Sequence, residues 1–306
     1  MRPWQDHEHD EQTRDRASCS LEAAKAEVPS GERSTDCSEL PNANDAPGNR
    51  ARAKAEPADF ETPATRALCE KIAELSGGVA LLGFSRGKDS VAAWLYLLRF
   101  FDRIIPFHCS SVPHLGFVDR SLNYYETFFG TKIHRFMDGA VLGDVYDLIW
   151  QPPTAEAELD RLRLFEFSRH ALAARLMDAH GVPDAWIAWG INASDSIDRQ
   201  IYVKKYQGRV AANRSFYPTF DWKRADIMRV LDAAGVKLAG DYLIANRTLA
   251  GVPTYRHAAR MRDVYPEDWD RVLCMFPMLE AELARQEFRR ERFDLLESDA
   301  PSKSVG

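Results

Sequence analysis

Six consecutive residues combine the side chains that a phosphate-binding turn requires. Ser85, Gly87 and Ser90 are small enough for backbone N–H groups to approach an anion, and Lys88 adds a full positive charge. Asp89 fits such a turn as an organiser of the loop or of a magnesium ion. The segment Ser85-Arg86-Gly87-Lys88-Asp89-Ser90 therefore predicts a phosphate-binding loop, with an ordinary strand-to-helix turn as the alternative. It matches neither G-x-x-x-x-G-K-[ST] nor G-x-G-x-x-G.

A second polar run follows the apolar segment 186–191 and begins at Gly190-Ile191-Asn192. Gly190 permits a close backbone approach at a strand end. Ser196 and Arg199 lie further along the run, and the planar guanidinium of Arg199 suits a phosphate or sulfate. The alternative is that nearby aspartates pair with Arg199 on a solvated helix face.

A third segment reads Tyr217-Pro218-Thr219-Phe220-Asp221-Trp222 and precedes a helix. We expect Asp221 to cap that helix, Trp222 to anchor it by packing, and Asp226 to lie in its first turn. This segment indicates a fold more than a catalytic group.

The elements around these residues alternate between apolar strands and helices. Such alternation predicts an α/β fold with a mainly parallel sheet and helices on both faces, of the Rossmann type. The phosphate-binding turn then joins the first strand to the following helix, where open α/β sheets bind ligands. We expect strands at 79–84, 104–109, 131–136 and 186–191, and helices at 63–76, 90–101, 119–130, 155–180, 221–235 and 266–293, the last broken near Pro277.

The composition divides the chain into parts. Residues 1–60 hold 13 acidic and 8 basic residues, so about −5 of the net charge of −6 lies there, and large apolar residues are sparse. We expect a disordered acidic tail over 1–60, a nucleotide-binding α/β domain over 61–250, a helical extension over 251–296 and a loose end over 297–306.

Charge and apolar patterning exclude several classes of protein. No apolar run approaches the roughly 18 residues of a membrane span, and no signal-peptide pattern is present, so we expect a cytoplasmic protein without a membrane partner. The five cysteines are scattered, which predicts no structural zinc and no side-chain metal cluster. A local run of basic and aromatic residues fits either a nucleic-acid or other polyanionic acceptor or a solvated face; it comprises Arg199, Tyr202, Lys204, Lys205, Tyr206, Arg209 and Arg214.

The turn resembles the PP-loop, S-G-G-x-D-S, of the adenine nucleotide alpha-hydrolase superfamily. The match is S-R-G-K-D-S, with Arg86 where the family usually has glycine. The second segment resembles the G-[IL]-R-x-x-x-S-x-x-R stretch of the phosphoadenosine phosphosulfate (PAPS) reductase branch, with Asn192 in place of its first arginine. The third resembles the P-[IL]-x-[DN]-W-x-x-x-D-[IV] stretch of the same branch. Together the matches span roughly residues 77–250.

The resemblance implies a set of site residues. Lys88, Asp89 and Arg199 are the implied catalytic residues. The implied contacts to an adenine nucleotide are Ser85, Arg86, Gly87, Lys88, Asp89, Ser90, Gly190, Ser196 and Arg199. The loop after the second strand lacks the Asp-Thr-Gly run of the family, and His108 and His114 are the residues there that could touch a ligand.

The chain departs from the reductases in its cysteines. It lacks their C-terminal Glu-Cys-Gly-Leu-His motif and the paired cysteines that bind an iron–sulfur cluster in some members, so we expect no such cluster. This favours an enzyme that uses ATP with magnesium, rather than PAPS, and adenylates a substrate, for example for sulfur transfer to a base or nucleic acid. The alternatives are a nucleotide-binding regulator that has lost catalysis and a PAPS reductase with an atypical thiol, for which Cys109 is nearest the expected crevice.

Overall fold

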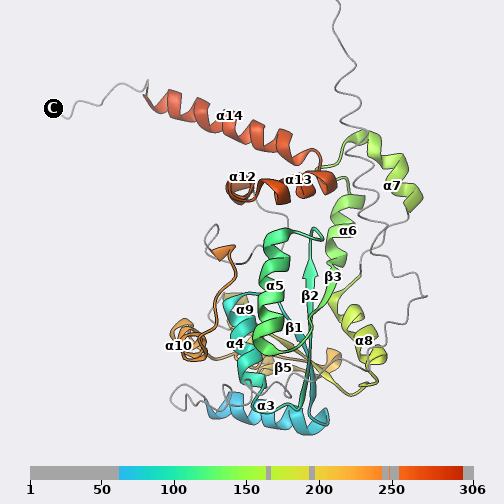
Figure 1. The fold of residues 1–306 in the computed structure, drawn as a ribbon, viewed down its shortest axis with the longest axis vertical. Coiled ribbons are helices and arrows are strands. Elements are labelled where there is room, and N and C mark those ends of the chain that lie inside the picture. The colour runs from blue at the N-terminus through green and yellow to red at the C-terminus, as the bar shows by residue number, and fades with distance from the viewer. Residues whose placement is uncertain (1–61, 163–166, 193–196, 243–247, 249–254, 299–306) are drawn as a thin grey trace, which may run out of the picture. The chain divides into compact units, whose positions relative to one another are not determined.

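The computed structural model of the protein describes residues 62–162, 167–192, 197–242, 248 and 255–298. The predicted tail, 1–60, therefore lies outside the described residues. The larger part of the chain contains α3 (Pro63–Leu75), β1 (Val79–Gly83), α4 (Lys88–Leu97), β2 (Arg103–Ser110), α5 (Gly116–Phe129), β3 (His134–Met137), α8 (Arg169–Ala179), β4 (Trp186–Trp189), α9 (Ile197–Tyr206), β5 (Arg209–Val210), η5 (Ala211–Asn213), β6 (Ser215–Phe216) and α10 (Arg224–Ala234). The remaining elements are α6 (Gly139–Tyr146), η3 (Pro153–Ala155), α7 (Glu156–Leu162), α12 (Tyr255–Val264), α13 (Pro266–Met275) and α14 (Leu279–Ser298) (Figure 1).

The strands form one sheet in the order β3-β2-β1-β4-β6-β5. The pairs β1–β2, β2–β3, β1–β4 and β4–β6 are parallel, and only β5 runs antiparallel to its neighbour β6. The chain adds β2 and β3 on one side of β1 and the later strands on the other. The order therefore reverses between β1 and β4, and the crevice at their carboxyl ends is where open α/β sheets bind ligands.

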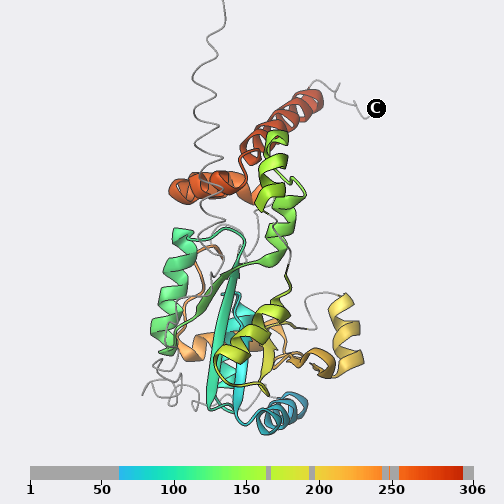
Figure 2. The same cartoon turned by 90° about the vertical axis from the view of Figure 1, so that its right-hand side faces the viewer.

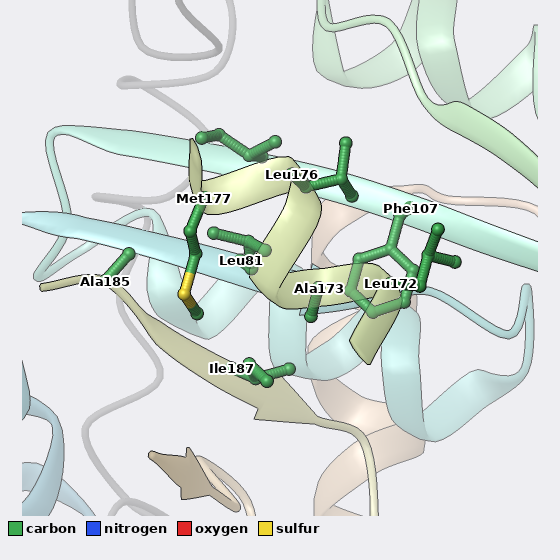
Figure 3. Close-up of a cluster of buried hydrophobic side chains, with 9 residues drawn as sticks. Leu81, Phe107, Leu172, Ala173, Leu176, Met177, Ala185 and Ile187 are labelled. Carbon is green, nitrogen blue, oxygen red and sulfur yellow. The ribbon is translucent and has the colours of Figure 1, made fainter. Parts of the chain in front are cut away.

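The central strand β1 is buried on both faces, which explains its continuous apolar sequence. On one face, Leu81 packs with Phe107 of β2, Ile187 of β4 and the apolar side of α8, including Leu176 (Figure 3). Each such fully buried side chain contributes about 2 kcal/mol to folding.

The opposite face of the sheet is covered by α4, α5 and α10 (Figures 1 and 2). Trp94 of α4 stacks on Phe129 of α5 with ring centroids 3.9 Å apart, and both side chains are fully buried. Tyr96 of α4 makes an edge contact with Trp222, which precedes α10. The prediction of an α/β fold with a mainly parallel sheet and helices on both faces is confirmed.

Several predicted helix boundaries are also confirmed. Thr62 caps α3 by accepting a hydrogen bond from the backbone N–H of Thr65. Gly235 ends α10 in a left-handed conformation at φ +64°. The predicted break near Pro277 separates α13 from α14.

Two helix predictions are wrong in detail. The single helix expected over 155–180 is two helices, because Ser168 has an extended backbone and caps the new helix α8 by accepting from Ala171 N–H at 3.1 Å. Asp221 does not cap α10. The backbone N–H of Lys223 donates instead to the Asp226 side chain at 2.9 Å, while Asp221 accepts a hydrogen bond from the Thr62 hydroxyl.

The chain divides into two compact units. The larger contains the whole sheet and, among described residues, 62–140 and 167–192, 197–242 and 248. The smaller joins residues 141–162 to the C-terminal helices of 255–298. Inside the smaller unit, Gln151 donates to the carbonyl of Met275 at 2.6 Å, and Trp150 makes an edge contact with Phe276. None of the described helices combines the length and apolar character that a membrane crossing needs.

Candidate functional site

The turn from Phe84 to Gly87 leads directly from the end of β1 into α4, on the side of the strand-order reversal. The helix begins at Lys88, two residues earlier than its apolar pattern predicts, so Lys88 and Asp89 lie in its first turn. Gly87 is the N-cap and has no side chain to accept from the first-turn N–H groups. An anion at this helix terminus would find backbone donors and the positive end of the helix dipole.

Two serines shape the turn from inside. The Ser85 hydroxyl donates to the Ser90 hydroxyl at 3.1 Å, and Ser90 donates to the carbonyl of Gly87 at 2.9 Å. The backbone N–H of Gly87 also points to Ser85 Oγ, at 3.4 Å. Ser90 is buried, whereas Ser85 is exposed. Ser90 therefore holds the turn closed, and Ser85 is the hydroxyl of the pair that a ligand can reach.

Lys88, Asp89 and Asn192 form a short chain of polar contacts across the crevice. The Lys88 ammonium lies 2.6 and 2.8 Å from the two carboxylate oxygens of Asp89. Asn192, just after β4, donates its amide to Asp89 Oδ1 at 2.7 Å. Its own Oδ1 is buried without a partner in the described structure. Asp89 thus ties the first turn of α4 to the end of β4, and its oxygens face an ammonium rather than an open site for magnesium.

Arg86 points away from the turn into the protein. Its side chain is fully buried, donates to Asp241 at 3.0 Å and to the Ser121 hydroxyl of α5 at 3.0 Å, and lies over the Phe117 ring. Burial lowers the pKa of the Arg86 guanidinium, and the Asp241 carboxylate opposes that shift. The guanidinium therefore fixes the turn from its buried side. It does not point to the solvent side, where a phosphate would bind.

The backbone of Arg86 explains the glycine of the family pattern. Its φ is +63°, in the left-handed region that glycine occupies without steric cost. The sequence shows the departure from the motif at this position. The buried partner of the guanidinium, 155 residues away, leaves no signal in the motif.

Two further residues approach the turn, and sequence reasoning missed both. The Tyr242 hydroxyl accepts a hydrogen bond from the backbone N–H of Lys88 at 2.9 Å. A Cβ added to Gly87 would lie 3.5 Å from the Thr248 hydroxyl oxygen and 3.2 Å from Ser85 Oγ. These hydroxyls come from a segment far along the chain with no recognisable motif, so only the fold brings them to the turn.

Gly190 packs against the start of α4. A Cβ at this position would lie 2.5 Å from both the backbone nitrogen and the Cα of Ser90. No other residue fits without moving the helix terminus, because the atoms it would meet are backbone atoms. The close approach expected of Gly190 is therefore an approach to the turn 85–90 itself.

A cavity of about 220 Å³ opens at the carboxyl ends of β1, β2 and β4. Its walls include Ser85, Gly190 and the aromatic rings of Phe107 and Trp189. Trp189 lies against Gly83, where an added Cβ would be 2.1 Å from the ring. The volume is below the range of about 300–1,000 Å³ typical of ligand pockets, so the cavity has room for one part of a larger ligand.

His108 and Cys109 also line the cavity. His108 is buried and donates from Nδ1 to the carbonyl of Phe84 at 2.7 Å. Burial, followed by the nearby charge of Arg86, lowers the pKa of His108 to about 3, so the ring is neutral at pH 7. His114, the other histidine singled out in the sequence, follows β2 with φ +57° and does not line this cavity.

The environment of Cys109 suppresses thiolate formation. Burial and then the neighbouring Asp138 carboxylate raise the pKa of the Cys109 thiol to about 12. Arg169, which also lines the cavity, is engaged in an ion pair with Asp138. A thiol in this state is a poor nucleophile, which disfavours the reductase alternative built on Cys109.

The remaining predicted site residues are placed only in part. Ser196 lies outside the described residues, and Arg199 lies in α9 with its side chain outside them. In the predicted basic run, Lys205 lies over the Tyr206 ring at 5.1 Å. Arg214 is turned toward the loop before β4, where it donates to the Pro183 carbonyl and lies 4.0 Å from Asp184. Arg214 therefore contributes less to an open basic surface than its sequence position suggests.

The comparisons with known proteins find similarity only among solved structures. No family model and no curated protein sequence matches this chain. The U34-tRNA thiolase NcsA from Methanococcus maripaludis, solved with its [4Fe-4S] cluster, is 12% identical over 72% of this chain and 79% of its own, with a TM-score of 0.38. The NH3-dependent NAD synthetase from Campylobacter jejuni, in complex with the nitrate ion, is 14% identical over 74% of this chain and 94% of its own, with a TM-score of 0.36.

The cofactor prediction needs correction. The sequence excluded an iron–sulfur cluster, yet one of the structures to which this chain is similar carries a [4Fe-4S] cluster, so that exclusion is wrong. The described cysteines, Cys69, Cys109 and Cys274, lie on three different elements. Within the described ranges, no three His, Cys, Asp or Glu side chains gather where they could hold a metal. Among the described residues, these cysteines supply no ligand set for such a cluster.

Neither of these two structures is described as a sulfonucleotide reductase. The comparisons therefore give the narrower resemblance to the PAPS reductase branch no support.

Proposed function

We propose that this chain is a PP-loop nucleotide-binding enzyme that cleaves ATP between its α and β phosphates and adenylates a substrate. One observation carries the proposal. The turn Ser85–Ser90 joins β1 to the glycine-capped N-terminus of α4 at the point where the strand order reverses, with Lys88 in the first helical turn. That arrangement provides backbone donors, a helix dipole and an ammonium for a single polyanionic group.

In the proposed reaction, an oxygen of the substrate attacks the α-phosphorus of ATP. The bond from that phosphorus to the α,β-bridging oxygen breaks, and its electron pair leaves with pyrophosphate. The barrier falls if fixed donors stabilise the charge that develops on the leaving group. The donors are the Lys88 ammonium and the first-turn N–H groups of α4 other than that of Lys88, which donates to the Tyr242 hydroxyl. The Ser85 hydroxyl adds a neutral donor if it turns from Ser90 to the ligand.

Asp89 and Asn192 act in this proposal through Lys88. Asp89 holds the ammonium at 2.6 Å, and Asn192 fixes Asp89 from the end of β4 at 2.7 Å. The ammonium is therefore kept at the mouth of the turn before a ligand arrives. Such preorganisation reduces the cost of ordering a long side chain on binding.

The acceptor in this proposal is a base or nucleic acid whose oxygen is adenylated. A sulfur nucleophile from a separate donor then forms the carbon–sulfur bond, and the carbon–oxygen bond breaks as AMP leaves. Positive charge from Lys205 on α9 and Arg209 on β5 supports a polyanionic acceptor. This part of the proposal concerns only the substrate and can fail while ATP cleavage stands.

The experiment is a product analysis with ATP labelled at the α-phosphate, using magnesium in the buffer and a panel of acceptors that includes tRNA and small nucleophiles. We expect labelled AMP or adenylated acceptor, with equimolar pyrophosphate. Lys88→Ala should lower the rate at least tenfold. Lys237→Ala, at an exposed lysine outside the segment 85–90, should not. Release of ADP, or no AMP with any acceptor, would contradict the proposed cleavage.

The second candidate is a nucleotide-binding regulator without turnover. Asn192 favours it, because an amide replaces the arginine of the reductase-branch segment at this position and is engaged with Asp89. ATP binding that depends on Lys88 without any product would support this candidate. For the atypical reductase, sulfite release from PAPS that survives Cys109→Ala and Cys274→Ala would remove both candidate nucleophiles.

A further inference from the structure

A groove separate from the nucleotide crevice lies between α3, α9 and the segment before α10. Its volume is about 880 Å³. Ala64 and Ala67 are both exposed and lie one turn apart on α3. Their short side chains leave space for the groove at this point. Phe220 is half-buried and completes the accessible apolar lining, and the buried side chains of Leu68 and Trp222 lie beneath it.

Basic side chains surround this apolar lining. Lys71 of α3, Arg209 of β5 and Lys223 at the start of α10 all line the groove. Lys71 and Lys223 are exposed, and Arg209 is half-buried. The acidic residue of the lining, Asp221, accepts a hydrogen bond from Thr62. The groove thus combines an apolar lining with a net positive rim.

The described chain begins beside this groove. Thr62, the first described residue, contacts Asp221 in the groove wall. The residues immediately before it read Glu56-Pro57-Ala58-Asp59-Phe60-Glu61, with three acids and one aromatic side chain. Six residues span at most about 20 Å when extended, so this segment cannot lie far from α3.

We propose that residues 56–61 of the same chain dock in this groove. Phe60 supplies the apolar group for the lining of Ala64, Ala67 and Phe220. The acids face Lys71, Arg209 and Lys223. The segment is covalently attached at Thr62, so docking is intramolecular. Its effective concentration near the groove is then about millimolar, and the groove is occupied even if the segment binds weakly. An acidic peptide with one aromatic residue matches both the lining and the rim, whereas a nucleic-acid backbone would leave the apolar lining uncovered.

This inference does not rest on the ATP-binding turn, although the docked segment and the proposed polyanionic acceptor share Arg209. Its test uses the full chain. A photo-reactive phenylalanine analogue replaces Pro57, and cross-linked peptides are identified by mass spectrometry after irradiation. We expect cross-links within one molecule to residues 64–71, 200–209 or 220–223. Mixing isotope-labelled and unlabelled chains separates them from cross-links between molecules.

Charge reversal makes the test specific. Lys71→Glu with Lys223→Glu should lower the yield of groove cross-links at least threefold, and Lys237→Glu should leave it unchanged, with circular dichroism and Tm confirming that all variants fold. The charge of the segment is reversed by changing Glu56, Asp59 and Glu61 each to Lys. This variant should lower the yield of groove cross-links as much as charge reversal of the groove does.

Three results would overturn the proposal. One is groove cross-links that survive both charge reversals, because proximity to Thr62 would then explain them. Another is cross-linking only between different molecules, which would assign the groove to the segment of a second copy. The third is an oligonucleotide that binds through Lys71 and Lys223 with an affinity indifferent to the acidic segment, which would assign the groove to nucleic acid.

Discussion

Arg86 combines an unfavourable backbone with a favourable side chain. Its left-handed φ of +63° costs about 1 kcal/mol relative to glycine, while its guanidinium pairs with Asp241 where both side chains are fully buried. Removing one member of a buried pair leaves an uncompensated charge and costs about 3–5 kcal/mol. The ion pair therefore outweighs the strain, which accounts for an arginine at a position whose backbone suits glycine.

This balance predicts the effect of Arg86→Gly. The variant should unfold with a free energy about 2–4 kcal/mol below that of the wild type, because relief of the backbone strain offsets only part of the lost pair. Urea denaturation measures the difference. Arg86→Gly with Asp241→Asn should recover part of the loss, since the stranded carboxylate is then neutral. A single variant as stable as the wild type would contradict the account.

His108 predicts how the free energy of unfolding depends on pH below neutrality. Its pKa in the folded protein is about 3, below the ordinary value of 6.5 that applies to the unfolded chain. Between these values, a fall in pH protonates the histidine only in the unfolded chain, so stability falls by up to about 1.4 kcal/mol per pH unit from this residue. The effect declines above pH 6.5 and is gone about one pH unit higher.

The matched variant is His108→Asn, whose amide can replace the Nδ1 donor to Phe84. Its unfolding free energy should depend less steeply on pH between 6 and 4 than that of the wild type, by about one bound proton. Denaturation curves at several pH values give both slopes. Equal slopes would mean that His108 is not held neutral in the folded protein.

Among the elements, β1, the turn and α4 can be predicted from the sequence. The residues from distant segments that contact the turn cannot. An apolar strand, a small polar turn and a helix are local patterns within about twenty residues. Asp241, Tyr242 and Ser121 reach the turn only through long-range packing, and no periodicity marks them. The short strands β5 and β6 were missed for a related reason, because two residues each cannot show an alternating pattern.

The contact between the end of β4 and the start of α4 is sensitive to substitution. Gly190→Ala places a Cβ 2.5 Å from backbone atoms of Ser90, so the first turn of α4 must shift. We expect at least a tenfold loss of ATP affinity together with lowered stability, measured by calorimetric titration and denaturation.

Gly181→Ala is the matched control for Gly190→Ala. Gly181 has φ +64° and open space around its missing side chain. The substitution should cost about 1 kcal/mol of stability from backbone strain alone and leave ATP affinity unchanged. Equal affinities for both glycine variants would show that the approach of β4 to α4 does not shape the binding turn.

For the whole molecule, the sequence predicts the α/β class because strands and helices alternate regularly. The grouping of residues 141–162 with the C-terminal helices leaves no sequence signal, since it joins segments about a hundred residues apart. The acidic residues before Thr62 look featureless as a sequence. Only the groove beside α3 gives them a proposed role.

The central claim is that the turn at the start of α4 binds the phosphates of ATP. The most direct measurement is calorimetric titration of the full chain with ATP and magnesium, repeated with pyrophosphate as competitor, for the wild type, Lys88→Ala and Lys237→Ala. The account predicts one site per chain, displacement by pyrophosphate, at least tenfold weaker binding for Lys88→Ala and no change for Lys237→Ala. Absence of binding by the wild type, or equal affinity for Lys88→Ala, would contradict it.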